Sequence, residues 1–304
     1  ARMSTTEPVG FIGTGAMGTE MVLRLRAAGH PVVVSNRTRG NAARAEQAGA
    51  EWAESPRLVA EGSGIVLSCL LDSAAVERVY LGPDGLVEAA RPGRVFVEHG
   101  TFSPVLAAEV HRRLAAVGAA FVDMPVTGGP EGTREGRLAA MAGGEPVAIE
   151  ATAAVVSAYC AQVTPIGGPG AGLQLKLVNQ LLVSSQMASA AEAIALLHRL
   201  GIDLDAAGSV LERGWAGSAM LTRALAQLRA GAVHGTGVKT VGMIEIQELI
   251  EELLDDPAAY PVFEGSRTVF ERAIARGLGD DDPAAMHLAV TAPNPAVRYT
   301  QEES

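Results

Sequence analysis

The sequence PVGFIGTGAMG at residues 8–18 joins a short apolar run to a G-x-G-x-x-G motif. The run is predicted to be a buried strand, and the motif to turn the chain into a helix. In such a unit the first glycine permits a tight turn, the second lets the backbone approach a pyrophosphate, and the third lets the helix pack on the strand. The free N–H groups at the helix start attract phosphate. We therefore expect a dinucleotide site made by Gly13, Thr14, Gly15, Ala16, Met17 and Gly18.

Short β-rich runs alternate with alanine-rich helical stretches through the first half of the chain. Strands that alternate with helices favour an α/β fold, a doubly wound parallel sheet with helices on both faces. We therefore expect an N-terminal Rossmann-like domain over residues 8–167. The predicted strands lie at residues 8–12, 31–35, 64–70, 94–100, 118–124 and 161–166.

After Gly172 the β-branched runs stop and Ala/Leu/Glu-rich stretches begin. Residues 173–200 are predicted to form most of one helix that starts near residue 171, joins two domains and is ~42 Å long over about 28 residues. The second domain, residues 168–292, is expected to be all-α. Residues 1–7 are expected to be a disordered leader and residues 293–304 a tail. Further helices are predicted near residues 205–213, 217–230, 238–255, 262–276 and 283–290.

Ser35-Asn36-Arg37-Thr38 follows the second predicted strand, where an acidic residue would bind the ribose 2′-hydroxyl of NAD. No carboxylate stands there. The guanidinium of Arg37 and the hydroxyl of Thr38 suit a 2′-phosphate, because arginine makes charge-assisted bidentate hydrogen bonds to it. With Asn36 beside them, these residues predict NADP(H) in preference to NAD(H), although Arg37 also fits a solvated loop.

Composition argues against several classes of partner. The 304 residues carry 24 lysines and arginines against 34 acidic residues, a formal charge of −10, and no basic run is present. Nucleic acid and an anionic membrane are therefore not expected as partners. The histidines and cysteines show no metal-ligand spacing, so no metal site is predicted. No stretch reads as an export signal, which favours a cytoplasmic location.

Only two of the 24 basic side chains are lysines, Lys176 and Lys239. Lys176 lies near the start of the long predicted helix, and Asn179 is three residues on, so both face the same way. A lone cation between leucines is costly unless it faces a polar cleft. An ammonium there can donate a proton to a carbonyl oxygen, whereas arginine would be a poor donor. We expect Lys176 to be a general acid/base that Asn179 helps to orient; a surface lysine is the alternative.

In a doubly wound sheet the ligand lies beyond the carboxyl ends of the strands. The hydroxyl of Thr127 and the unobstructed N–H groups of Gly128 and Gly129 can hold a carboxylate, although this segment also fits a Pro/Gly turn. His99, which lies at the end of a predicted strand, is more simply a hydrogen-bonded structural residue. The candidates that follow strands are Leu70, Leu71, Thr101, Thr127, Gly128 and Gly129.

Four motifs in order resemble those of the β-hydroxyacid dehydrogenases, the family of 3-hydroxyisobutyrate dehydrogenase and tartronate semialdehyde reductase. The likeness covers about residues 8–290. The motifs are GFIGTGAMG at 10–18 for the cofactor, DMPVTGG at 123–129 for the substrate, GAGLQLKLVNQ at 170–180 for catalysis, and the cofactor-side Lys239. The resemblance implies hydride transfer to or from an alcohol carbon beside a carboxylate, so a small carboxylate-bearing substrate is expected.

The resemblance also assigns residues to parts of the site. It implies that Lys176 is the general acid/base. It places Thr127, Gly128, Gly129 and Asn179 around the substrate, and Leu71, Thr101 and Lys239 near the nicotinamide end of the cofactor.

Several positions depart from the family pattern. Ser is common where this chain has Gly100 and Thr127, Asn where it has Gln180, Asp where it has Thr240, and an aromatic residue where it has Ala232. These changes spare the proton donor and the cofactor loop but alter the walls of the pocket. We therefore expect the same reaction, with room for a substrate larger than the usual short hydroxy acids.

Two other functions stay open from the sequence. An imine reductase resembles this family in fold and cofactor motif but generally lacks the helix lysine. A non-catalytic NADP-binding regulatory protein would have no need of Lys176 and Asn179. Whichever function holds, the apolar faces of the predicted helices favour a homodimer or a higher homo-oligomer.

Overall fold

The protein is described by a computed structural model that covers residues 7–290. The chain divides into two compact units, one ending at Leu177 and the other beginning at Val178. The expected domain boundary at Gly167 lies shortly before this division. The expected tail and the expected leader, apart from Glu7, lie outside the described residues.

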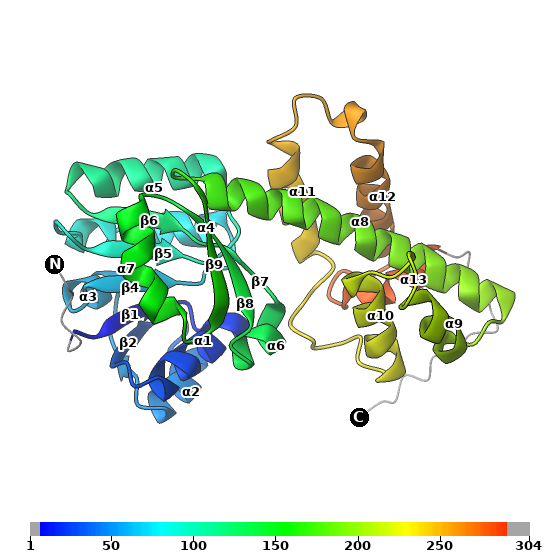
Figure 1. Ribbon diagram of the computed structural model, residues 1–304, viewed down its shortest axis with the longest axis horizontal. Coiled ribbons are helices and arrows are strands. Elements are labelled where there is room, and N and C mark those ends of the chain that lie inside the picture. Colours follow the sequence, from blue (N-terminus) through cyan, green and yellow to red (C-terminus); the bar gives the residue numbers. More distant parts are fainter. Residues whose placement is uncertain (1–6, 291–304) are drawn as a thin grey trace. The chain divides into compact units, whose positions relative to one another are not determined.

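The first unit is built on a mostly parallel sheet (Figure 1). Six strands run parallel in the order β3-β2-β1-β4-β5-β6, and β8 then runs antiparallel to β6. Strand β8 also pairs with β7 antiparallel and with β9 parallel. The strands are β1 Val9–Ile12, β2 Val32–Ser35, β3 Glu51–Trp52, β4 Ile65–Ser68, β5 Val95–Glu98, β6 Ala120–Asp123, β7 Val126–Thr127, β8 Leu138–Gly143 and β9 Cys160–Gly167.

All six predicted strands are confirmed, and the predicted α/β sheet with them. The sequence did not predict β3, β7 or β8. Strands β3 and β7 are only two residues long, and β8 reads LAAMAG, whose alanines are depleted in strands. The sheet departs from the predicted parallel arrangement at this edge, where β8 runs antiparallel to β6 and β7.

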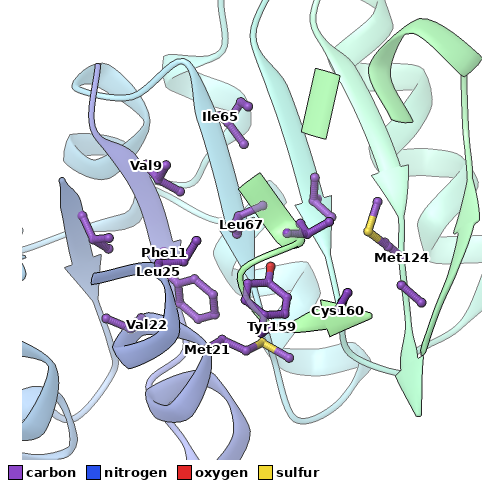
Figure 2. Packing of buried hydrophobic residues seen from close by; sticks show 14 of the residues in the cluster. Val9, Phe11, Met21, Val22, Leu25, Ile65, Leu67, Met124, Tyr159 and Cys160 are labelled. Atoms are coloured by element: carbon purple, nitrogen blue, oxygen red, sulfur yellow. The ribbon is translucent and has the colours of Figure 1, made fainter. Parts of the chain in front are cut away.

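Helices cover both faces of the sheet, and each face has its own core. Alternate residues of β1 point to opposite faces, so Phe11 joins one cluster and Ile12 the other. Helix α1 packs on the Phe11 side (Figure 2), as does α7, and α3 and α5 pack on the Ile12 side. The helices are α1 Ala16–Ala27, η1 Arg39–Ala42, α2 Ala43–Gln47, α3 Pro56–Glu61, α4 Ser73–Val76, η2 Glu77–Leu81, η3 Val87–Ala89, α5 Pro104–Ala116, α6 Gly129–Arg134 and α7 Pro146–Val156.

The second unit is all-α among the described residues, as the sequence predicts. Its core consists of two apolar clusters, one around Phe270 and one around Ile194. The helices are α8 Ala171–Leu200, which begins in the first unit, α9 Leu204–Leu211, α10 Ala219–Arg229, α11 Gly242–Glu251, η4 Pro257–Ala259, α12 Pro261–Ala275, η5 Pro283–Met286 and α13 His287–Val290.

One helix is shorter than predicted. The predicted helix near residues 238–255 begins only at Gly242, because Thr240 N and Val241 N donate to Asp281 O and Gly279 O instead of to a preceding helical turn.

Helix α8 is long and apolar enough to cross a membrane by those two criteria alone. Leu173 and Ile194 of α8 are nevertheless buried in core clusters, as in the central helix of a globular protein.

Candidate active site

The turn between β1 and α1 has the geometry that a pyrophosphate needs. Gly13 has a φ of +93°, and a Cβ there would lie 2.4 Å from Cys69 O. A Cβ on Gly18 would lie 1.8 Å from Gly13 O, so only glycine lets α1 pack so closely. Gly15 instead faces open space, with no atom within 4 Å of a Cβ. Because the first N–H groups of a helix have no partner inside it, the exposed edge at Gly15 and Ala16 can receive phosphate.

Asn36 ties this turn to the end of β2. Thr14 N donates to Asn36 Oδ1 at 3.1 Å, and Asn36 Nδ2 donates to Thr38 O at 2.9 Å. Met17 packs against the core cluster below. The Thr14 hydroxyl is buried and has no hydrogen-bond partner within residues 7–290. A buried hydroxyl of this kind beside an open phosphate cradle fits a bound polar ligand, so the residues present suit a dinucleotide.

Arg37 differs from the arginine that follows it. Arg39 pairs with Glu46 at 3.1 Å and with Glu54 at 3.6 Å, and it lies over the ring of Trp52. Arg37 is exposed at the end of β2 and forms no ion pair with any described residue. Its guanidinium is therefore available to an anion.

A buried carboxylate, Glu98 at the end of β5, joins the loops after β4 and β5. Glu98 Oε1 accepts hydrogen bonds from Leu70 N at 3.0 Å and from Gly100 N at 2.6 Å, and Ser68 Oγ donates to Oε2. Burial raises the pKa of Glu98, and these hydrogen bonds oppose that rise. A Cβ on Gly100 would lie 2.5 Å from Leu70 O and 2.8 Å from Glu98 Oε1. In this chain the backbone at residue 100 therefore suits glycine and not the serine common in the family.

The two loops held by Glu98 carry residues expected near the nicotinamide. Leu71 is 84% exposed, and Thr101 is half-buried. Each follows directly after a residue whose N–H donates to Glu98, namely Leu70 and Gly100. The sequence reasoning missed Glu98; the available signal was an acidic residue at the end of an otherwise apolar strand.

Lys176, on α8, is buried with only 8% of its surface exposed. Its Nζ donates to Val126 O at 3.0 Å, and it forms no ion pair with a carboxylate among the described residues. Burial lowers the pKa of Lys176 from 10.5 to about 8. A buried amine whose pKa lies near neutrality can give or take a proton close to physiological pH.

The structure brings Lys176 against the Thr127-Gly128-Gly129 segment, because its acceptor Val126 directly precedes Thr127. Thr127 is half-buried and ends β7. Gly128 and Gly129 have φ values of +128° and +64°, which favour glycine. A hydroxyl, two glycines at the start of α6 and an ammonium are thus gathered at one edge of the sheet.

Asn179 follows Lys176 by three residues on the continuous helix α8. Asn179 Nδ2 donates to Oε1 of Gln180 at 3.0 Å. Gln180, which departs from the family pattern, therefore accepts a hydrogen bond from the Asn179 side chain that is expected to orient Lys176.

Lys239 precedes α11 and belongs to the second unit. It is exposed and pairs with Asp280 at 2.7 Å. Thr240 is buried, and its hydroxyl donates to Asp281 O at 2.9 Å. Ala232, where the family commonly has an aromatic residue, is half-buried.

His99 is a structural residue, as predicted. Its Nδ1 lies 2.8 Å from Met124 O and its Nε2 lies 2.8 Å from the Tyr159 hydroxyl. Burial lowers the pKa of His99 to about 4, so the ring is neutral near physiological pH. The neutral ring donates from Nδ1 to the carbonyl and accepts at Nε2 from the tyrosine.

Comparison with known proteins agrees with this geometry in both halves of the chain. Residues 8–168 match the family model of the NAD binding domain of 6-phosphogluconate dehydrogenase. Residues 170–289 match the family model for NAD-binding of NADP-dependent 3-hydroxyisobutyrate dehydrogenase.

Curated relatives match over most of the chain. The 2-(hydroxymethyl)glutarate dehydrogenase of Eubacterium barkeri is 29% identical over 93% of this chain and 95% of its own. The 2-hydroxy-3-oxopropionate reductase of Escherichia coli (strain K12) is 33% identical over 70% of this chain and 73% of its own.

Two solved structures resemble this chain to different degrees. The structure of Psf3 in complex with NADP+ and 2-OPP has a TM-score of 0.88 and 30% identity over 93% of this chain and all of that one. An imine reductase from Pseudomonas sp. has a TM-score of 0.63 at 19% identity over 94% of this chain and 99% of that one, and this likeness shows the fold alone. The chain therefore belongs to the β-hydroxyacid dehydrogenase family, NAD(P)-dependent oxidoreductases that act on the CH–OH group of hydroxy acids.

Proposed function

We propose that this chain is an NADP(H)-preferring β-hydroxyacid dehydrogenase in which Lys176 is the general acid/base. The observation that carries the proposal is the buried Lys176 ammonium, which has a backbone acceptor, no carboxylate partner among the described residues, and a pKa lowered to about 8. In reduction the ammonium donates its proton to the carbonyl oxygen of the substrate. In oxidation the neutral amine takes the proton of the hydroxyl group.

The nicotinamide cofactor, when bound, supplies or takes up the hydride. The chain's own residues hold and orient it. The open edge at Gly15 and Ala16 receives the pyrophosphate, and Glu98 fixes the loops that carry Leu71 and Thr101. Lys239 is proposed as a further contact of the cofactor.

The preference for NADP(H) rests on the end of β2. Arg37 is exposed and unpaired among residues 7–290, and Thr38 stands beside it where a carboxylate would select NAD(H). A 2′-phosphate would supply Arg37 with the charge-assisted partner that Arg39 already finds in Glu46.

The substrate is proposed to carry an anionic group beside the reacting carbon. The N–H groups of Gly128 and Gly129 and the hydroxyl of Thr127 would bind that group next to Lys176, and Asn179 would orient the reacting oxygen. The names of the two curated relatives describe hydroxy or oxo carboxylates, which fit this arrangement. A homodimer and a cytoplasmic location stay predictions.

A substrate panel tests the proposal. NADPH consumption is followed with 2-hydroxy-3-oxopropionate, short keto acids and a cyclic imine, and NADP+ reduction with 3-hydroxyisobutyrate and 2-(hydroxymethyl)glutarate. We expect turnover with carboxylate-bearing carbonyls or alcohols, and a loss of about 100-fold or more in kcat in Lys176→Ala with NADPH binding nearly intact. Turnover of the imine alone, or unchanged turnover in the variant, would overturn the proposal.

A further inference from the structure

Asp123 ends β6, and its carboxylate is fully buried at the first turn of α8. Oδ1 accepts a hydrogen bond from Gly170 N at 2.7 Å, and Oδ2 accepts one from Leu173 N at 2.9 Å. Both oxygens are thus used to hold backbone N–H groups that have no partner within the helix. A negative charge at this position also interacts favourably with the helix dipole.

Glycines on two neighbouring elements make room for this carboxylate. Gly143 faces Asp123 across the β6–β8 pair, and a Cβ there would lie 2.6 Å from Oδ1. A Cβ on Gly172 would lie 2.6 Å from Asp123 O and 2.9 Å from Oδ2. The sheet edge and the helix therefore approach the Asp123 side chain as closely as backbone allows.

The contact made by Asp123 runs beside the one made by Lys176. Asp123 bonds to Leu173, and three residues further along each segment Val126 bonds to Lys176. Each of the two bonds joins residues 50 apart in the sequence. On α8 three residues are about one turn, a rise of ~4.5 Å. The two contacts are thus successive links between the same pair of segments, and the first sets the distance across which the second forms.

We propose that Asp123 is a positioning residue for Lys176: its carboxylate clamps the first turn of α8 to the β6–β7 segment and so holds the Lys176 ammonium, buried, against the loop of Thr127. This inference rests on the proposed function, because it takes Lys176 as the proton donor and acceptor. Asp123 itself has no contact with the reacting atoms. Its effect passes through the position and the burial of the lysine.

The clamp is sensitive to acid. Burial raises the pKa of Asp123 from 3.8 to about 6, and the backbone hydrogen bonds oppose that rise. Below this pKa one oxygen carries a proton and becomes a poorer acceptor, so one of the two links weakens. The reduction rate should therefore fall as the pH drops through about 6.

Few other titratable groups lie near enough to mimic this response. Strand β5 places Glu98 beside Asp123 in register, and His99 follows it. Strand β8 and the first turn of α8 contain no titratable side chain before Lys176. The only titratable residue of helix α7 is the exposed Glu150. Helix α5 brings His111 and a Glu109 that pairs with Arg112 and Arg113.

The two-lysine composition allows a direct test without any substrate. Lysine labelled with carbon-13 at Cε gives one signal from Lys176 and one from the exposed Lys239. In Asp123→Asn the amide can accept only one of the two hydrogen bonds and turns a donor toward the other N–H. We expect the pKa of Lys176 in this variant to rise from about 8 toward 10.5, because the released turn lets water reach Nζ. A Lys176 pKa unchanged from native would overturn the proposal.

Asp203→Asn is a matched control. Asp203 caps α9 by accepting from Asp205 N and Ala206 N, so the substitution removes a capping carboxylate from a helix that holds no predicted site residue. We expect its Lys176 signal and kcat to be native. If Asp123→Asn fails to fold, a pH titration of the Lys176 signal in the native protein still tests the proposal. Its Lys176 signal should show a second inflection near pH 6, the pKa of Asp123, and a single inflection would contradict the clamp.

Kinetics separate this inference from the proposed function. In Asp123→Asn we expect kcat to fall about 100-fold, as for a small misplacement of a catalytic group, with little change in the KM for NADPH and no acid limb near pH 6. If Lys176→Ala is inactive while Asp123→Asn keeps the native kcat and pH profile, Asp123 has no positioning role and the proposed function stands. If Lys176→Ala stays active, the proposed function itself fails.

Discussion

The buried Lys176 should give the two directions of the reaction opposite pH dependences around its pKa of about 8. Reduction needs the ammonium as proton donor, so its rate falls about tenfold per pH unit above this pKa. Oxidation needs the neutral amine as proton acceptor, so its rate rises about tenfold per pH unit until the pKa is reached and is then level. The two profiles should therefore break near the same pH and in opposite senses.

The size of the effect follows from the burial of the side chain. A pKa lowered from 10.5 to about 8 means that the site disfavours the ammonium by about 3 kcal/mol. At about pH 7.5 roughly a quarter of the molecules then hold a neutral amine, against roughly 0.1% for a lysine with its ordinary pKa. Burial of Lys176 thus accounts for about 200-fold in the rate of oxidation at that pH.

The assay is the initial rate of NADPH formation or consumption between about pH 6 and pH 10, with the hydroxy acid and carbonyl compound that the panel identifies. Lys176→Arg is the informative variant. Arginine keeps the positive charge, but its pKa lies above ~12, so it neither gives nor takes a proton in this pH range. The kcat of both directions should therefore fall about 10²- to 10⁴-fold. NADPH binding, followed by its fluorescence, should stay near native.

Two results would refute this reasoning. One is a response of the same sign in both directions near pH 8. The other is a Lys176→Arg enzyme that keeps more than about a tenth of the native kcat, since a general acid contributes at least about 100-fold.

Three further predictions concern the cofactor, the loop after β5 and the assembly. Arg37→Ala should reduce the ratio of kcat/KM with NADPH to kcat/KM with NADH about 10- to 100-fold, because a charge-assisted hydrogen bond is lost. Arg39→Ala should change this ratio less, because Arg39 already pairs with Glu46 and Glu54, and equal effects would contradict the assignment. Gly100→Ser should lower the free energy of unfolding in urea by about 1–3 kcal/mol, because its Cβ meets backbone at 2.5 Å, while Gly168→Ser, which meets nothing within 4 Å, should be near neutral. Leu182 is 55% exposed on α8, so Leu182→Asp should convert the expected homodimer to a monomer in light scattering, and a native monomer would contradict the expected assembly.

Local features of the sequence were sufficient for the outline of the fold. The glycines at 13, 15 and 18 predicted the strand–turn–helix unit, because a positive φ and close backbone packing are demands that glycine meets through its own geometry. Short β-rich apolar runs and long Ala/Leu stretches predicted the sheet and α8 for the same local reason. The short β7 and the alanine-rich β8 carry no such signal, and they are strands because β7 pairs with β8 and β8 pairs with β6 and β9.

The candidate site divides in the same way. The scarcity of lysine and the motif order singled out Lys176 and Lys239 as residue types suited to their proposed roles. The sequence could not predict that Glu98 and Asp123 bind backbone N–H groups of distant segments, because a carboxylate's partner depends on which chain segments meet.

The order of the elements and the identity of the groups that can do chemistry follow from the sequence: a glycine-rich phosphate turn, an arginine without a competing carboxylate, and a lysine in place of arginine. The tertiary structure decided their properties. Lys176 has a pKa of about 8 only because folding removes it from water and leaves it a single backbone acceptor, Val126 O. The cost of burying a charge depends on everything packed around it, and a backbone carbonyl 50 residues away in the sequence reaches the Lys176 ammonium only once the chain has folded.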